Sequence, residues 1–200
     1  AHQLKTDQDV LENLSSWKKG EDQPTRKSSG AILNQIAAKT PWLVGGDADL
    51  SCSTNTLIKE SSDFNGQHPE GKNIRYGVRE HAMAAIANGI CYHGGLRPFV
   101  ATFFCFSDYM KPALRLAAMN HLPVICVWTH DSIGLGEDGP THQPIEHLAA
   151  LRALPHFTLI RPCDANETRE AWKVAMDTKD HPIGLVLTRQ KLPVLDRSQV

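Results

Sequence analysis

The sequence lacks the marks of several large classes of protein. Its 200 residues carry 21 basic and 22 acidic side chains, a net charge of -1, so no basic excess points to nucleic acid. No apolar run approaches the length of about 20 residues that a bilayer-crossing helix needs, and no signal peptide is recognisable. We therefore expect neither a nucleic-acid partner nor a membrane.

Cysteine is scarce as well, and no two cysteines form a C-x-x-C pair. The five cysteines are odd in number and widely spaced: Cys52, Cys91, Cys105, Cys126 and Cys163. This spacing argues against a zinc site and against a disulfide framework. It favours reduced thiols and a cytoplasmic location.

The length and the 41% hydrophobic content fit a globular protein with one main domain. Residues 1–24 are polar and predict a linker or N-terminal arm, with one short helix around Val10–Trp17. The domain is predicted over residues 25–200.

Helical and strand patterns alternate along this domain. Apolar spacing predicts helices over 28–38, 78–92, 104–118, 145–154 and 166–177, the last with Asp164 or Asn166 as N-cap. Strands are predicted over 42–46, 97–102, 124–128, 158–161 and 183–187, and residues 51–73 predict a long loop. This alternation is typical of an α/β fold with a mostly parallel sheet flanked by helices.

The most informative segment is THDSIGLGEDGPTHQP, Thr129 to Pro144. It follows an apolar run, and its three glycines rule out a regular helix. It carries five titratable side chains: His130, Asp131, Glu137, Asp138 and His142. Parallel sheets bind their ligands beyond the carboxyl ends of strands. A solvent-facing connection would explain the polarity equally simply, but the density of titratable groups favours a site.

Other residues also admit a structural and a functional interpretation. Glu80 lies at the start of a predicted helix. Its structural role would be to interact favourably with the helix dipole, and its functional role would be to hydrogen-bond a heterocycle nitrogen. Three aromatic residues recur at three-residue spacing: Phe103, Phe106 and Tyr109. They are either core residues on one buried helix face or a group that stacks on a flat ring of a ligand.

Charged residues near the ends of the predicted domain suggest anion binding. Arg26, in TRKSS, and Arg189, in TRQ, are candidate phosphate clamps, although surface salt bridges are the ordinary role of such side chains. His130, Asp138 and His142 show no metal-ligand spacing, so we predict no metal site in this chain. They fit a hydroxyl-rich substrate better.

Six motifs together resemble one family. They are GGDADL (45–50), YGVREHAM (76–83), TFFCFSDY (102–109), the segment 129–144, RPCDANE (161–167) and LTRQKLP (187–193). From about Arg26 onward the chain resembles the central, pyrimidine-binding domain of transketolases. The related dihydroxyacetone synthases remain an alternative, and Asp47 departs from the serine more familiar in the first motif.

The resemblance implies a role for each matching residue. Glu80 would hydrogen-bond N1′ of the aminopyrimidine of thiamine diphosphate and, with His142, act in catalysis. The cofactor-binding set would be Asp49, Leu50, Glu80, Phe103, Phe106 and Tyr109. Asp138 and His142 would contact sugar hydroxyls, whereas the phosphate of the sugar would be bound by Arg26, Ser53, His130 and Arg189.

The resemblance also implies an enzyme larger than this chain. The family's diphosphate and Mg²⁺ are held by a second domain with a G-D-G element, which this sequence lacks, and that domain comes from the partner subunit of a homodimer. The implied reaction is the reversible transfer of a two-carbon ketol unit from a ketose phosphate to an aldose phosphate, in the pentose phosphate pathway. We expect the isolated chain to be inactive. A non-catalytic interaction module and a subunit of a split enzyme are the alternatives.

Overall fold

The computed structural model describes Leu4 and residues 8–197. Its centre is a six-stranded, all-parallel sheet in the order β2-β1-β3-β4-β6-β5. The strands are β1 (Leu43–Asp47), β2 (Asn73–Arg75), β3 (Arg97–Phe103), β4 (Ile125–Thr129), β5 (Thr158–Ile160) and β6 (Ile183–Val186). The predicted α/β class with a parallel sheet is confirmed.

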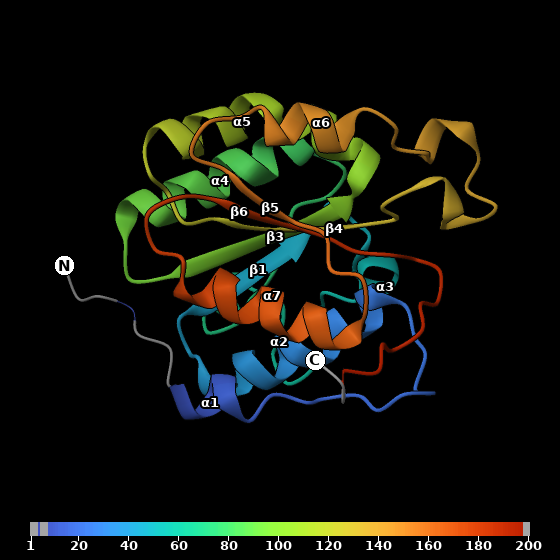
Figure 1. The fold of residues 1–200 in the computed structure, drawn as a ribbon. Coiled ribbons are helices and arrows are strands. Elements are labelled where there is room, and N and C mark those ends of the chain that lie inside the picture. The colour runs from blue at the N-terminus through green and yellow to red at the C-terminus, as the bar shows by residue number, and fades with distance from the viewer. Residues whose placement is uncertain (1–3, 5–7, 198–200) are drawn as a thin grey trace.

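Helices cover both faces of this sheet (Figure 1). One face carries α4 (Glu80–His93), α5 (Ser107–Met119) and α6 (His147–Arg152), and the other carries α1 (Gln8–Glu12), α2 (Thr25–Lys39) and α7 (Ala165–Asp177). Short helices lie in the connections: α3 (Ser51–Thr54), η1 (Phe104–Phe106), η2 (Ile133–Leu135) and η3 (Pro140–His142).

The central strands are buried on both sides, as their continuous apolar runs require. In β4, Ile125 and Val127 pack against α2 and α7, whereas Cys126 and Trp128 pack against α4 and α5. In β1, a Cβ at Gly45 would overlap the Phe99 carbonyl oxygen of β3. Glycine therefore allows the close approach of these two strands.

The predictions were wrong at several boundaries. Strand β2 and helix α3 lie at the ends of the segment predicted as a long loop, and the predicted helix 104–118 begins with a separate 3-10 turn. The first helix spans Gln8–Glu12 rather than Val10–Trp17, and α6 is shorter than predicted. Of the two proposed caps for α7, Asp164 is the N-cap: it accepts a hydrogen bond of 2.8 Å from the Glu167 N–H.

The proposed arm, residues 1–24, packs against the domain where it is described; its residues 1–3 and 5–7 lie outside the described residues. Leu11 and Leu14 are buried in the core beneath α2. Gln23 pairs through its backbone with Leu192, so this segment and the C-terminal segment run side by side.

The sheet topology predicts where a ligand would bind. The connection after β1 leads to β2 on one side, whereas the connection after β3 leads to β4 on the other. Such a reversal opens a crevice at the carboxyl ends of the strands. None of the described helices combines the length and the apolar character needed to cross a bilayer.

Candidate active site at the carboxyl edge of the sheet

An aromatic cluster lies where β3 ends and α5 begins. The Phe103 ring, at the end of β3, stacks on the His130 ring with centroids 3.7 Å apart. The Phe106 ring is nearly parallel to Phe103 at 6.1 Å, and Tyr109 lies 6.3 Å beyond it. His142 presents an edge to both phenylalanines, at 6.0 and 5.2 Å. Because Tyr109 is 63% exposed, the cluster reaches the surface and can stack on a flat ring.

His130 is fixed in a buried, polar position directly after β4. Its backbone is left-handed (φ 59°), and its Nδ1 lies 2.9 Å from the Thr129 hydroxyl. Its Nε2 faces Asp138 Oδ2 at 4.0 Å. Burial, together with the positive charges of Arg26 and Arg189 and against the opposing effect of Asp138, lowers the pKa of His130 to about 4. The imidazole is therefore neutral near pH 7.

Two Thr-Arg dipeptides hold the candidate phosphate clamp together. The Thr25 N–H donates to Thr188 Oγ1 at 3.0 Å, and the Thr188 N–H donates to Thr25 Oγ1 at 2.7 Å. Both threonines are buried. This reciprocal pairing joins the start of α2 to the segment after β6, and it places Arg26 and Arg189 close enough for Arg189 to lower the pKa of Arg26, after the larger effect of burial.

The two arginines contact different loops. Arg26 donates from its guanidinium to the Ser53 carbonyl oxygen at 2.7 Å. Arg189 pairs with Glu137 at 2.7 Å and lies 3.9 Å from Asp138 Oδ2. That Asp138 oxygen is buried and has no hydrogen-bond partner among the described residues. An acceptor aimed inward without a partner is suited to a ligand hydroxyl.

Glu80 is the first residue of α4, where the helix dipole favours a carboxylate. It is 8% exposed, and none of the hydrogen bonds or ion pairs of the described residues involves its carboxylate. Burial raises the pKa of the nearby Cys105 thiol to about 11, and Asp108 and Glu80 contribute to the rise. This effect places Glu80 within electrostatic range of the η1 turn, which carries Phe106 of the aromatic cluster.

The turn after β1 explains the unusual Asp47. Its carboxylate is buried and accepts a hydrogen bond from the Leu50 N–H, and burial raises its pKa. Asp49 adopts a left-handed backbone (φ 66°) and is exposed, whereas Leu50 is half-buried. Asp47 therefore stabilises the turn that presents Asp49 and Leu50.

The structure thus connects most of the predicted site residues through direct contacts. One connected set comprises the aromatic residues with His130, His142, Asp138 and Arg189. Arg26 and Ser53 contact each other and are tied to this set through the pairing of Thr25 with Thr188. Among the described residues, no hydrogen bond, ion pair or ring contact joins Glu80 or Asp49 to these groups.

Sequence reasoning missed one buried ion pair beside the site. The Asp131 carboxylate is fully buried and accepts from Arg161 at 2.6 and 2.8 Å. It also accepts from the Ser132 hydroxyl at 3.0 Å. The pair joins the carboxyl ends of β4 and β5. A signal was available, because Arg161 ends one predicted strand and Asp131 lies three residues after another.

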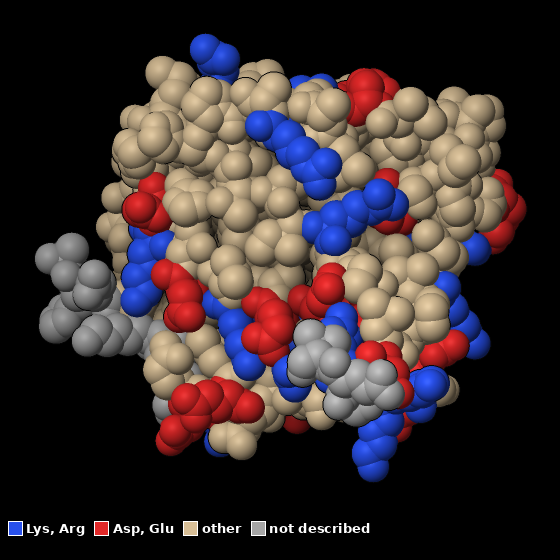
Figure 2. Space-filling model, viewed as in Figure 1, with Lys and Arg blue, Asp and Glu red and all other residues tan. Residues whose placement is uncertain are grey.

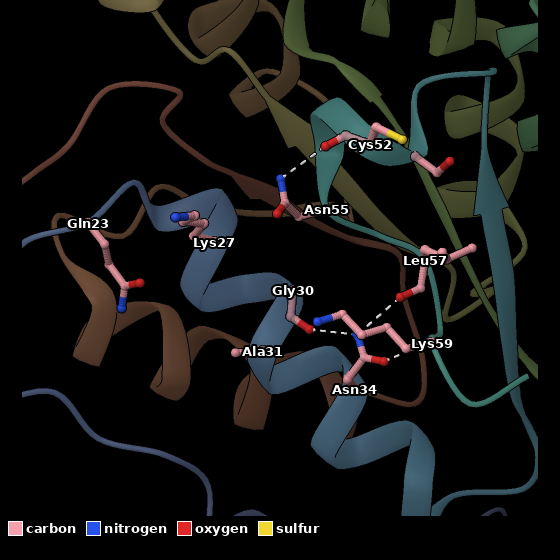
Figure 3. A pocket seen from close by; sticks show the side chains of 10 residues that line it. Gln23, Lys27, Gly30, Ala31, Asn34, Cys52, Asn55, Leu57 and Lys59 are labelled. Atoms are coloured by element: carbon pink, nitrogen blue, oxygen red, sulfur yellow. Dashed lines mark hydrogen bonds between the residues drawn. The ribbon is translucent and has the colours of Figure 1, made fainter.

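A cavity of about 450 Å³ lies between α2 and α3 (Figure 3). Lys27 and Asn34 line it from α2, and Cys52 and Lys59 line it from the other side. Asn34 is committed to structure, because its amide bonds the backbone of Gly30, Leu57 and Lys59. The cavity has no aromatic lining, so it does not fit a stacked heterocycle.

One group of potential metal ligands also lies apart from the contacts described above: Asp108, Glu146 and His147. His147 Nε2 lies 3.1 Å from Asp108, which also pairs with Lys111 at 2.6 Å. These protein partners account for both oxygens of Asp108.

Comparison with known proteins agrees with this geometry. A profile of the family described as "Transketolase, pyrimidine binding domain" matches residues 21–194. The transketolase of Aquifex aeolicus is 53% identical over 191 residues, which are 96% of this chain and 27% of that protein.

Two solved structures extend the comparison. A transketolase variant from Pichia stipitis, in complex with fructose 6-phosphate, is 43% identical with a TM-score of 0.93, over 96% of this chain and 29% of that one. A split-gene transketolase, described as an inactive beta4 tetramer, is 30% identical with a TM-score of 0.68, over 88% of this chain and 55% of that one. The chain spans little more than a quarter of the curated relative.

Proposed function

Because the chain belongs to the transketolase family, as its pyrimidine-binding domain, we propose that it forms one domain of a thiamine-diphosphate-dependent transketolase. That enzyme reversibly transfers a two-carbon ketol unit from a ketose phosphate to an aldose phosphate. The observation that carries the proposal is that the exposed aromatic cluster shares one edge of the sheet with a buried Asp138 oxygen that accepts no hydrogen bond from the described residues. Arg26 and Arg189, which the pairing of Thr25 with Thr188 brings together, lie at the same edge.

The residues present fit the aminopyrimidine half of the cofactor. Phe103, Phe106 and Tyr109 would stack on the ring, and the turn at Asp49 and Leu50 would border it. The Glu80 carboxyl, which has no protein partner among the described residues, would share a proton with a ring nitrogen. When bound, thiamine diphosphate supplies a nucleophilic carbon and an electron sink for cleaving a carbon–carbon bond beside a carbonyl.

The second group of residues fits a phosphorylated sugar. Asp138 offers an unpaired buried oxygen to a hydroxyl, and His142 lies at the aromatic cluster, where it would act on the reacting end. Neutral His130 adds a hydrogen-bonding group without a charge. Arg26 and Arg189, with Ser53 beside them, would bind the phosphate and hold the sugar in one direction.

The diphosphate and Mg²⁺ would be held by another domain, contributed by a partner subunit in a homodimer. Helices α4 and α5 pack together and expose large apolar side chains: Ile86, Tyr92, Tyr109, Leu116 and Met119. In Figure 2 the surface over these helices is largely uncharged, whereas charges gather over α1, α2 and α7. An apolar surface of this kind is typical of a contact with another domain.

The alternatives are less well supported. A non-catalytic interaction module would not need two arginines brought together by the pairing of Thr25 with Thr188. It would also not need a buried Asp138 oxygen without a hydrogen-bond partner among the described residues. A subunit of a split enzyme or of a dihydroxyacetone synthase would use the same site with other partners. The five free cysteines agree with the cytoplasmic, reducing location that we propose. The place in the pentose phosphate pathway that we propose follows from the proposed reaction alone.

The experiment is reconstitution. With thiamine diphosphate, Mg²⁺, fructose 6-phosphate and an aldose phosphate, the chain alone should show no ketol transfer. Joined to a diphosphate-binding domain of a transketolase, it should show turnover, measured by coupled detection of the aldose product. Turnover by the chain alone, or none in the joined enzyme while a natural transketolase is active, would contradict the proposal.

A further inference from the structure

The donors of Arg189 are partly occupied by a neighbouring acidic side chain. Glu137 Oε1 lies 2.7 Å from one terminal nitrogen of the guanidinium, and Asp138 Oδ2 lies 3.9 Å from its Nε. The two acidic residues come from the loop after β4, whereas Arg189 follows β6. The guanidinium therefore lies against two successive carboxylates of one loop.

Gly136 makes this approach possible. Its backbone has φ 104°, a conformation that other residues rarely adopt, and a Cβ there would lie 2.6 Å from a nitrogen of Arg189. Gly139 also has a positive φ, of 85°. Glycines on both sides of Glu137 and Asp138 therefore let the backbone of the loop lie against the Arg189 guanidinium.

The two carboxylates differ in how firmly they are held. Asp138 is 28% exposed and buries its unpaired Oδ2, so it is part of the fixed site. Glu137 is 81% exposed, and water can solvate its carboxylate as soon as it leaves Arg189. Exposed ion pairs contribute little to stability. Glu137 can therefore be displaced at low cost, whereas Asp138 cannot.

We propose that Glu137 is a specificity-determining competitor for the anion site of Arg189. It occupies with a carboxylate the donors that a phosphate would use, and a bound phosphate must displace it. A doubly charged phosphate outcompetes a single, exposed carboxylate, whereas a neutral sugar end does not. This inference rests on the proposed function, because it assumes that Arg189 binds the phosphate of the substrate.

The test compares fructose 6-phosphate with fructose as donors in the assembled, cofactor-loaded enzyme. Glu137→Gln should lower KM for fructose 6-phosphate about two- to five-fold, the range expected when a weak surface pair no longer competes. KM for fructose should not change. Glu146→Gln is the matched control, because it removes an equally charged, exposed carboxylate that does not contact Arg189, and it should change neither KM.

Arg189→Gln separates this inference from the proposed function. If it leaves KM for fructose 6-phosphate unchanged, Arg189 is not the phosphate site, and that part of the proposed function fails. If Arg189→Gln raises this KM but Glu137→Gln leaves it unchanged or raises it, the competitor role is overturned. An equal decrease with Glu146→Gln would also overturn it, because the effect would then be general electrostatics. Since Glu137 is exposed, its replacement should leave the fold intact.

Discussion

At the scale of single residues, His130 shows how position sets chemistry. The same imidazole would titrate near 6.5 in solvent, but burial and two nearby arginines lower its pKa to about 4. Asp138, at 4.0 Å, offsets only part of this effect. A histidine in solvent becomes protonated below about pH 6.5, whereas these surroundings keep His130 a neutral hydrogen-bonding group down to about pH 4.

The titration of His130 can be measured directly. By NMR of the imidazole, His130 should titrate near 4, and Arg26→Gln should raise its pKa because one repelling charge is removed. The unfolded chain takes up this proton near 6.5 and the folded chain only near 4. His130 should therefore make the folded state less stable as pH falls from about 6.5 to about 4. A titration near 6.5 would contradict the buried geometry.

Only some of the site could be predicted residue by residue. Spacing alone left core and solvent-exposed alternatives for Glu80 and the aromatic residues, and the assigned roles came from the family resemblance. Spacing cannot show that Glu137 pairs with Arg189, 52 positions away. The pairing of Thr25 with Thr188 was missed for the same reason, although both belong to a Thr-Arg dipeptide.

At the scale of elements, the sequence predicted the strands that are buried on both faces. Strands β3, β4 and β6 are largely apolar runs and β1 begins with one. Short runs of this length, bounded by turn residues and rich in β-branched and aromatic side chains, indicate strands buried on both faces. Strand β2, Asn73–Arg75, was missed because this edge strand has three residues and one apolar side chain. Its conformation depends on pairing with β1, which no local pattern records.

The ion pair of Asp131 and Arg161 should stabilise the carboxyl edge of the sheet, where it ties the segment after β4 to the end of β5 across β6. Arg161→Ala leaves a fully buried carboxylate without its cation. Because the Arg161 side chain is 38% exposed and water can reach that side of the pair, the free energy of unfolding should fall by about 1–3 kcal/mol. Adding Asp131→Asn removes that buried charge and should restore part of the loss. Urea unfolding of the three variants measures both effects. If the double variant is no more stable than Arg161→Ala, the unpaired charge of Asp131 is not the cause of the lost stability.

At the scale of the whole molecule, the fold collects residues from distant segments at one edge. Residues after β1, β3, β4 and β6 meet there because all strands of the sheet are parallel. This gathering follows from the predicted alternation of helices and strands. The proposed contact with a further domain does not follow from this alternation, and it rests on the exposed apolar side chains of α4 and α5.

The central claim is that this domain binds the aminopyrimidine through Glu80. The most direct test is the rate of hydrogen–deuterium exchange at C2 of thiamine diphosphate bound to the assembled enzyme. Glu80→Gln keeps the size of the side chain but cannot share a proton in the same way, so exchange should slow by about 10²–10⁴-fold. Glu60→Gln, at an exposed glutamate, is the control and should have no effect. Unchanged exchange in Glu80→Gln would contradict the assignment of this site.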